Sequence, residues 1–559
     1  MDNYAIADQF SLLAKLMDIH GENSFKAKSY AAAAFNIEKI TEPLASMSEE
    51  KLFAQKGIGE SAGKKITEII QTGELKALKD ILAKTPEGVL EMMNIKGLGP
   101  KKINTIWKEF GIDTINELEA ACREHRVAAI KGFGAKTEQK IVESIEFVRE
   151  NEGKFLYKHV EEFALAMTEK IQQAFPNERT SLTGEFRRQL EIISQLEWVT
   201  TVSKDALLAY MNKQEIALLQ QLAELLVFRA EDLVNLEFHL APKEAFAQTL
   251  LETSSSDEFR TAWRSLSAST SNVPDEETLF ASAGLSFVPP FLRESESVLE
   301  KARTTAFDDV VQTNSIKGLI HSHSNWSDGA NTIEQMTEEL IRLGFEYLVI
   351  SDHSKSAGYA NGLSESRIKE QHKYIDDLNK KFAPFKIFKS IECDILGDGT
   401  LDYDDKTLSS FDLVITSVHS NLDMEEDKAM MRLMGAITNP YTTILGHMTG
   451  RLLLRRKGYP IDHKSVIDAC VKHNVVVEIN ASPSRLDIDW RWIDYAVEKG
   501  ALLSINPDAH SLDNFQYVKY GTLVAQKGGL PTNRNLSSYS LREFEKFLAE
   551  QKEKKLAVK

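Results

Sequence analysis

The chain has 559 residues, and at roughly 150 residues per domain this length indicates three or four domains. Its hydrophobic content of 42% and charged content of 27% are ordinary for a soluble globular protein. The net charge of -16 at pH 7 excludes a uniformly basic coat for nucleic acid, although local basic patches can still bind phosphate.

The cysteines and the first residues of the chain bear on its compartment. Cys122, Cys393 and Cys470 form no CxxC pair, which argues against a disulfide framework or a thiolate zinc site. The N-terminus lacks the basic start and apolar run of a signal peptide, and no stretch of about 18 apolar residues follows. We therefore expect a cytoplasmic monomer without a membrane partner.

Residues 1–150 contain a repeat that predicts helical hairpins. Its copies lie about 35 to 40 residues apart, and each has Gly-x-Gly before a helix start with lysines: QKGIGESAGKKI, IKGLGPKKI and IKGFGAKTEQKI. Paired glycines allow a tight turn close to a phosphate, and the free N–H groups of the next helix favour an anion. We predict a DNA-binding domain whose contacts are Gly57, Gly59, Lys64, Lys65, Gly97, Gly99, Lys101, Lys102, Gly132, Gly134 and Lys136. Such contacts do not read base sequence, so gapped, nicked or 3′-ended DNA is the expected partner.

The middle of the chain, residues 151–295, predicts a mixed α/β region. Its Ser, Thr and Pro content from about 264 to 275 predicts an exposed loop, and a pair of prolines, Pro289 and Pro290, marks the approach to the next domain. We place a linker at 296–315 and a C-terminal domain at 316–559. The last segment, LREFEKFLAEQKEKKLAVK, predicts an amphipathic helix with a basic end.

Seven short apolar runs in the C-terminal domain predict buried strands, each ending in residues that can bind metal. In chain order they are KGLIHSH, YLVISDH, FKSIECD, LVITSVHS, TTILGHM, VVVEINA and LLSINPDAH. Segments with helical periodicity lie between them, so the pattern is a repeating βα unit. Because a parallel barrel gathers the C-terminal ends of its strands on one face, we expect a cluster there of His321, His323, Asp328, His353, Glu392, His419, His447, Asp508 and His510.

The cluster predicts a multinuclear metal site. Nine imidazole and carboxylate ligands exceed what one ion needs, and these groups suit Mn²⁺, Zn²⁺ or Fe. Clustered ions of this kind usually hydrolyse phosphate esters. Nearby, Glu478 and Asn480 either orient ligands or are structural, and Trp326 either packs in its loop or stacks on a terminal base.

The motifs resemble a bacterial X-family DNA polymerase fused to a polymerase and histidinol phosphatase (PHP) domain. The resemblance covers nearly the whole chain through GENSFKAKSYAAAA, the hairpins, GEFRRQLE, GLSFVPPFLRE, HSHSNWSDG, SDHS, ECDIL, SVHS, GHMTGRLL, EINASPSRLDIDW and PDAHS. It implies a multidomain α and α/β protein. A helical helix-hairpin-helix region would be followed by a nucleotidyltransferase-like palm and a distorted (β/α)7 PHP barrel.

The resemblance also implies three divalent ions, with Mn²⁺ favoured over Zn²⁺ or Fe. The implied ligand sets are His321, His323, Glu392 and Asp508 for one ion, Glu392, His419 and His447 for a second, and Asp328, His353 and His510 for the third. Catalysis would depend directly on His321, His323, Glu392, His419 and Asp508. Leu319 and Pro507 stand where the family often has Asp and Thr, which puts the support of the ligands in doubt but leaves the ligands complete.

The polymerase half departs from the family pattern at its metal ligands. Family polymerases hold two Mg²⁺ ions with an Asp-x-Asp pair and a third carboxylate, and the matching positions here are Gln195, Glu197 and Glu237. A neutral Gln195 cannot bridge two divalent ions, and the longer Glu side chain displaces a metal that demands octahedral geometry.

The nucleotide-binding loops also differ from the family. Glu185 replaces a Ser in the loop around the triphosphate, and the serines at 254–256 replace a Thr-Gly-Ser turn, while Arg187 and Arg188 persist. A carboxylate would repel the nucleotide, and arginines alone do not perform the chemistry. We therefore predict that polymerase activity is lost.

Several classes of function remain open. A nuclease acting on DNA ends in repair, as a 3′-5′ exonuclease or an abasic-site endonuclease, accounts for both the ligands and the hairpins. The alternatives are an active repair polymerase with 3′-5′ exonuclease activity, a phosphomonoesterase on a small substrate, and a scaffold with silent sites. For the nuclease, Arg451 and Arg485 are the cationic candidates for binding substrate phosphate, although each could equally form a surface ion pair.

Overall fold

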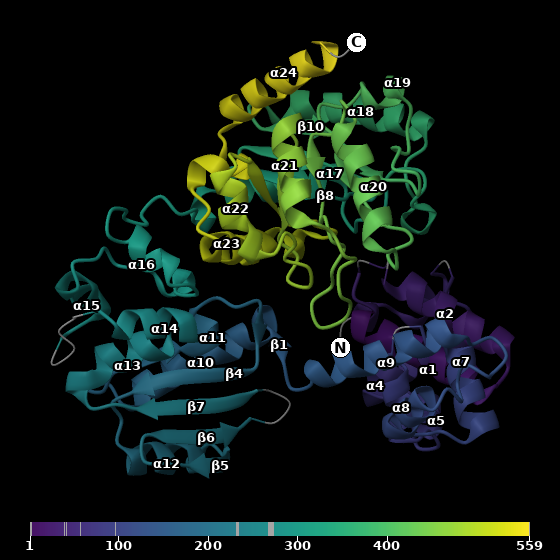
Figure 1. Cartoon of the computed structure of the whole chain (residues 1–559). Coiled ribbons are helices and arrows are strands. Elements are labelled where there is room, and N and C mark those ends of the chain that lie inside the picture. The colour runs from purple at the N-terminus through teal and green to yellow at the C-terminus, as the bar shows by residue number, and fades with distance from the viewer. Residues whose placement is uncertain are drawn as a thin grey trace. The chain divides into compact units, whose positions relative to one another are not determined.

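The computed structural model describes residues 3–557 apart from residues 39, 41, 56, 96, 231–233 and 267–272. The chain folds into two compact units, residues 1–152 and 153–559 (Figure 1). The division lies close to the predicted end of the first domain, and the predicted middle and C-terminal domains both belong to the second unit. Residues 267–272 of the predicted loop lie outside the described residues.

The first unit is helical. Its α-helices are α1 (Asn3–His20), α2 (Ser24–Glu38), α3 (Glu49–Phe53), α4 (Glu60–Thr72), α5 (Lys76–Leu82), α6 (Glu87–Met92), α7 (Pro100–Asn104), α8 (Ile115–Arg123) and α9 (Ala135–Glu150). The repeats form the hairpins α3–α4, α6–α7 and α8–α9. In each, the first glycine has a left-handed backbone, with φ of +83° at Gly57, +88° at Gly97 and +91° at Gly132. Because side chains disfavour that conformation, the glycine explains why the same turn recurs.

The second unit begins with a mixed sheet. Its strands β2 (Thr180–Thr183), β4 (Gln195–Thr200), β5 (Ala217–Gln221), β6 (Leu225–Arg229) and β7 (Asn235–Leu240) have the order β2-β4-β7-β6-β5, and β1 (Phe155–Leu156) pairs with β3 (Ile192–Ile193). The helices here are α10 (Tyr157–Ala174), α11 (Gly184–Arg187), α12 (Lys204–Lys213), α13 (Phe246–Thr253), α14 (Asp257–Arg264) and α15 (Glu276–Ser282). Helix α10 buries Val160, Ala164, Met167 and Ile171, a spacing that gives it one apolar face toward the sheet core.

The rest of the unit is a barrel of short parallel strands. These are β8 (Gly318–Ser322), β9 (Tyr347–Ile350), β10 (Lys386–Lys389), β11 (Glu392–Asp394), β12 (Ile415–Ser417), β13 (Ile444–Leu445), β14 (Val476–Asn480) and β15 (Leu503–Asn506). They form the sheets β10-β9-β8 and β11-β12-β13-β14-β15. Parallel bridges join the two sheets at both ends, His353 with Glu392 and Ser322 with Ala509.

The run FKSIECD differs from its prediction as one strand. It contributes β10, which pairs with β9, and β11, which pairs with β12. Between them, the Ser390 N–H still donates to the Ile350 carbonyl at 2.9 Å. The two strands therefore occupy one position of the barrel, and the predicted (β/α)7 arrangement is confirmed.

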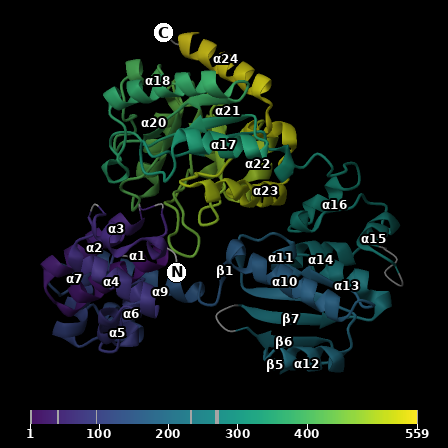
Figure 2. The same ribbon diagram turned by 180° about the vertical axis from the view of Figure 1, so that it is seen from behind.

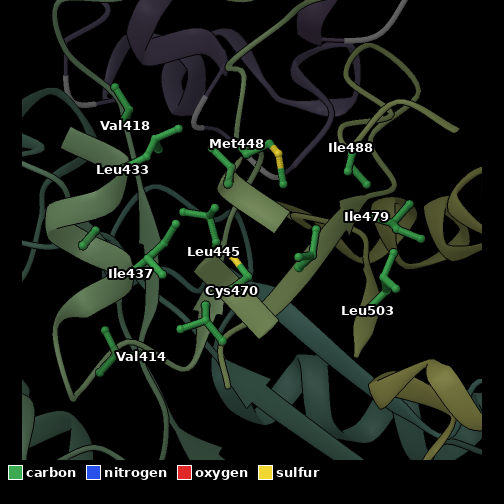
Figure 3. Close-up of a cluster of buried hydrophobic side chains, with 14 of the residues drawn as sticks. Val414, Val418, Leu433, Ile437, Leu445, Met448, Cys470, Ile479, Ile488 and Leu503 are labelled. Atoms are coloured by element: carbon green, nitrogen blue, oxygen red, sulfur yellow. The ribbon is translucent and has the colours of Figure 1, made fainter. Parts of the chain in front are cut away.

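Helices surround these strands (Figures 1 and 2). They are α17 (Ile333–Leu343), α18 (Glu365–Phe382), α19 (Asp405–Leu408), α20 (Glu426–Thr438), α21 (His463–His473), α22 (Ile493–Glu498), α23 (Val518–Lys527) and α24 (Leu541–Ala557), preceded by α16 (Ser297–Lys301). Figure 3 shows the main core, where Leu433 and Ile437 of α20 and Cys470 of α21 pack among strand residues such as Leu445. This apolar packing holds the strand ends in place.

The sheet region and the barrel are joined by buried polar contacts. The Lys527 Nζ at the end of α23 donates to the Arg188 carbonyl at 2.9 Å and to Glu294 at 2.6 Å, and its side chain is fully buried. Glu191 accepts from the Trp490 Nε1 at 3.1 Å. Through the part of the chain that is described, no helix has the length and apolar character needed to cross a bilayer.

Candidate metal centre

All nine predicted ligands lie together at the C-terminal ends of the barrel strands. His321 is in β8 and Glu392 opens β11, while the other ligands follow strands directly or lie in the loop after β8. Imidazole and carboxylate atoms within 4.8 Å of one another define three overlapping groups: His321, His323 and Asp508; His353, Glu392 and His419; and His323, Asp328, His353 and His510. His447 joins them through its Nε2, 3.0 Å from Glu392 Oε1.

The donor set fits divalent metal ions. Among the described buried side-chain atoms that lack a hydrogen-bond partner, five belong to the cluster: His321 Nε2, His323 Nδ1, His353 Nδ1, His447 Nδ1 and Glu392 Oε2. Buried nitrogen and oxygen atoms without partners are rare because desolvation is unfavourable. Their concentration in one cluster is consistent with a site for metal ions.

Electrostatics keeps the carboxylates of the centre ionised. Burial acts to raise the pKa of Glu392, but the imidazoles of His419, His321 and His353 outweigh it and hold that pKa well below the ordinary value. Burial also acts to raise the pKa of Asp508, but His321 and His323 outweigh it and hold that pKa well below its usual range. The anionic form is the one that binds cations.

Two ligands have strained backbones. His321 and Asp508 have φ of +64° and +51°, in the left-handed region that non-glycine residues seldom adopt. The surrounding contacts maintain this conformation, since the Ala509 N–H donates to the His321 carbonyl and the His323 N–H donates to the Ala509 carbonyl at 2.8 Å. Such strain clusters at functional sites.

Carboxylates behind the ligands fix the orientation of the imidazole rings. Glu478 lies 2.5 Å from His321 Nδ1 and accepts from the His447 N–H at 2.7 Å. Glu478 therefore supports the His321 ring in this chain. Leu319, at the position where the family often has Asp, packs in the hydrophobic core instead. Asp394 lies 2.5 Å from His419 Nδ1. These contacts select the ring nitrogen that faces the metal.

Asp394 was missed in the sequence, although a signal existed. It lies two residues after Glu392 on the same strand, so both side chains point to the same side. Asp352, next to His353, was also missed. It is buried and accepts from the Ser324 N–H at 2.8 Å and from Gln371 at 2.6 Å, which ties together the loops after β8 and β9.

We expect Asp394→Asn to lower the affinity for Mn²⁺ by about 10- to 100-fold, because an amide holds the His419 ring less firmly than a carboxylate. Titration of metal-free protein with Mn²⁺ measures this change. Asp398→Asn is the control, since Asp398 is exposed and its carboxylate accepts hydrogen bonds from the N–H and hydroxyl of nearby Thr400. Equal affinities of both variants and the wild type would contradict a role of Asp394 in orienting the ligand.

The two arginines predicted to bind phosphate differ. Arg451 donates to the carbonyls of Arg485 and Leu486 and lies 2.5 Å from Asp489, contacts that occupy its guanidinium in the fold. Arg485 Nε lies 3.6 Å from Asp508 Oδ2, beside the metal ligands. Arg485 is therefore the better placed of the two to bind a phosphate at the centre.

The three positions that the sequence predicts as a degenerate polymerase site lie on two adjacent strands. Glu197 of β4 and Glu237 of β7 are directly paired in the sheet, whereas Gln195 faces Asn235. His239 Nε2 lies 2.9 Å from Glu197, and atoms of Glu197, Glu237 and His239 all lie within 4.8 Å of one another. Burial and the neighbouring Glu197 raise the pKa of Glu237. One imidazole and two carboxylates differ from the all-oxygen shell that Mg²⁺ prefers.

The loop that carries Arg187 and Arg188 is occupied by contacts within the protein. Arg187 lies 2.5 Å from Glu276 and donates to the Ser254 Oγ at 2.8 Å. Arg188 lies 3.0 Å from Glu294. Glu185, expected to face a nucleotide, instead accepts from the Ser194 N–H at 2.6 Å. Both guanidinium groups of this loop therefore pair with carboxylates of the protein itself.

The predicted DNA contacts sit at the starts of helices in the hairpins. Gly59, Gly99 and Gly134 are the N-cap residues of α4, α7 and α9. Lys64 pairs with Glu60 at 2.6 Å, and Lys102 donates to the Gly97 carbonyl at 3.1 Å. An exposed ion pair such as Lys64–Glu60 is weak, so it does not prevent a lysine from turning to phosphate.

Comparisons with known proteins match the hairpin and barrel regions. A helix-hairpin-helix domain matches residues 1–75, a SAM-like helix-hairpin-helix tandem matches residues 89–146, and a PHP domain matches residues 320–482. The chain is 32% identical to the DNA polymerase/3′-5′ exonuclease PolX of Bacillus subtilis (strain 168), over 96% of this chain and 97% of that protein. Over 31% of this chain it is 27% identical to a probable phosphatase of Photobacterium profundum, of which 70% is covered.

This order of domains, with tandem hairpins before a mixed sheet and a PHP barrel, defines a class of multidomain proteins that bind nucleic acid and metal ions. More particularly, the chain belongs to the family of X-family DNA polymerases with a PHP domain.

Proposed function

We propose that the chain removes nucleotides from the 3′ ends of DNA, using its barrel as a metal-dependent 3′-5′ exonuclease in DNA repair. The convergence of nine imidazole and carboxylate side chains at one end of the barrel carries this proposal. The relative from Bacillus subtilis is named as a 3′-5′ exonuclease, which supports the choice of substrate. Bound divalent ions would lower the pKa of an attacking water and stabilise charge on the phosphate.

The chain's own residues bind the ions and orient the substrate. Glu392 lies at the middle of the cluster, 3.0 Å from His353 and 3.2 Å from His419, so it is the ligand suited to bridge two ions. We propose that the centre holds three ions, with Mn²⁺ favoured over Zn²⁺ or Fe, a number that the three overlapping ligand groups support. Arg485 would hold a phosphate oxygen, and the hairpins would bind the DNA backbone without reading its sequence.

We further propose that polymerase activity is lost. Gln195 supplies no charge to bridge two Mg²⁺ ions, and Arg187 and Arg188 are bound to Glu276 and Glu294. A triphosphate would have to break these ion pairs before either arginine could bind it. The observation that favours the opposite view is that the Bacillus subtilis relative is named as a polymerase.

The test uses a 5′-labelled primer on a gapped template with Mn²⁺ and all four deoxynucleotides. We expect the wild type to shorten the primer and His419→Ala to be slower by at least about 100-fold, because a ligand is lost together with its contact to Asp394. Extension of the primer by both proteins would contradict the loss of polymerase activity. Absence of shortening by the wild type would contradict the exonuclease.

The probable phosphatases among the relatives favour a second candidate, a phosphomonoesterase on a small substrate. Gapped DNA separates the two candidates as a competitor in a phosphatase assay with p-nitrophenyl phosphate. Strong competition is expected if DNA is the substrate of the same centre. Hydrolysis that DNA does not affect would favour the phosphomonoesterase.

A further inference from the structure

The metal centre opens to solvent on one side. The side chains of His321 and His323 are 0% exposed, whereas those of His510 and Asp328 are 38% and 29% exposed. A substrate therefore reaches the centre past Asp328 and His510. His353 borders this opening, with its Nε2 3.6 Å from Asp328 Oδ2.

An aromatic ring stands beside this opening. Tyr359 is 69% exposed, and its ring centroid lies 6.2 Å from that of His353. Over the described residues of the barrel, the other exposed large hydrophobic side chains are the aliphatic Ile341, Leu343 and Met431. Trp326, the stacking candidate from the sequence, is only partly exposed and packs against the core and Tyr374.

The loop that carries Tyr359 is firmly held. Ala357 and Ala360 on either side are buried, and the Leu363 N–H donates to the His353 carbonyl at 2.9 Å. Gly362 lies so close to the Ser354 carbonyl that a Cβ would be 1.9 Å from it. A single exposed hydrophobic residue is common on a protein surface, but here packing on both sides holds the backbone that carries the ring.

We propose that Tyr359 is a subsite for the base of the nucleotide being removed, on which any nucleobase stacks while its phosphate lies at the metal ligands. The proposal rests on the exonuclease function and names its substrate more closely: a 3′-terminal nucleotide that has left the duplex stack. Stacking on an aromatic face does not depend on base identity, which agrees with hairpins that read only the backbone.

The experiment measures kcat/KM with Mn²⁺ on two 5′-labelled single strands. One strand ends in thymidine, and the other ends in a tetrahydrofuran residue that lacks a base. The ratio of kcat/KM on the thymidine strand to kcat/KM on the tetrahydrofuran strand measures the contribution of the terminal base. Stacking predicts that Tyr359→Leu lowers this ratio by about 5- to 150-fold, and that Tyr359→Phe, which keeps the ring, preserves it.

The possible results are distinct. An unchanged ratio in Tyr359→Leu would overturn the proposal, whether both rates persist or both fall together through damage to the loop. A ratio that falls equally in Tyr359→Phe would also overturn it, because the hydroxyl and not the ring would then be responsible. If the wild type shortens neither strand, the exonuclease function fails first and the base subsite fails with it.

Discussion

Replacing Glu392 by glutamine is expected to slow DNA hydrolysis at least about 1000-fold, a loss of several kcal/mol of transition-state stabilisation. The Glu392 carboxylate lies within 3.3 Å of four imidazoles, at 3.3 Å from His321, 3.0 Å from His353, 3.2 Å from His419 and 3.0 Å from His447. A neutral amide keeps the shape of the side chain but cannot bridge two cations. Single-turnover rates and bound-metal analysis measure the two consequences, loss of rate and loss of metal.

The matched control is Glu365→Gln on the surface of the barrel. Glu365 pairs with Lys355 at 2.7 Å, and both side chains are exposed, so this substitution should leave the hydrolysis rate unchanged. Hydrolysis at the normal rate by Glu392→Gln would show that another part of the chain is the nuclease. A full set of bound ions in the same variant would show that Glu392 is not the bridging ligand.

The ligand cluster could be predicted from the sequence because strand topology determines it. Once His353 and His419 follow apolar strands of one parallel barrel, they must lie on the same face. The division of the third run into β10 and β11 could not be predicted. It depends on where the chain exchanges one neighbouring strand for the other, between Lys389 and Glu392, and no local pattern marks that point.

The contacts of Arg187 and Arg188 could not be predicted for a different reason. Arg187 meets Glu276, 89 residues later, and Arg188 meets Glu294, 106 residues later. The sequence shows that both arginines persist but not what they bind. Likewise, the exposure of Tyr359 depends on the packing of its loop, so the sequence did not single out this residue as one that could stack on a base.

Glu276→Gln is expected to lower the free energy of unfolding by about 3 to 5 kcal/mol, because it leaves a buried cation without a counterion. Arg293 is 0% exposed, and its Nη1 lies 2.5 Å from Glu276 Oε1. Burial lowers the pKa of Arg293 to about 10, so it stays charged at neutral pH. Urea unfolding monitored by tryptophan fluorescence measures the change.

Two further measurements isolate this buried ion pair. Glu300→Gln removes an exposed partner of Arg303 nearby and should change the free energy by less than about 0.5 kcal/mol. Burial acts to raise the pKa of Glu276, but Arg293 and Arg187 outweigh it, so its folded pKa is lower than its unfolded pKa. Its stabilisation is therefore complete above the unfolded pKa and is lost as the pH falls through the folded value.

The same glutamate also pairs with Arg187, one of the two arginines of the loop around the predicted nucleotide site. Arg187 shares Glu276 with Arg293, so a triphosphate that recruited Arg187 would disturb a pair on which folding depends. If Glu276→Gln unfolds at the wild-type urea concentration, the pair is dispensable and Arg187 is available to a nucleotide. A destabilisation of the expected size would instead show that the fold depends on Glu276, the residue that Arg187 would have to leave before it could bind a nucleotide.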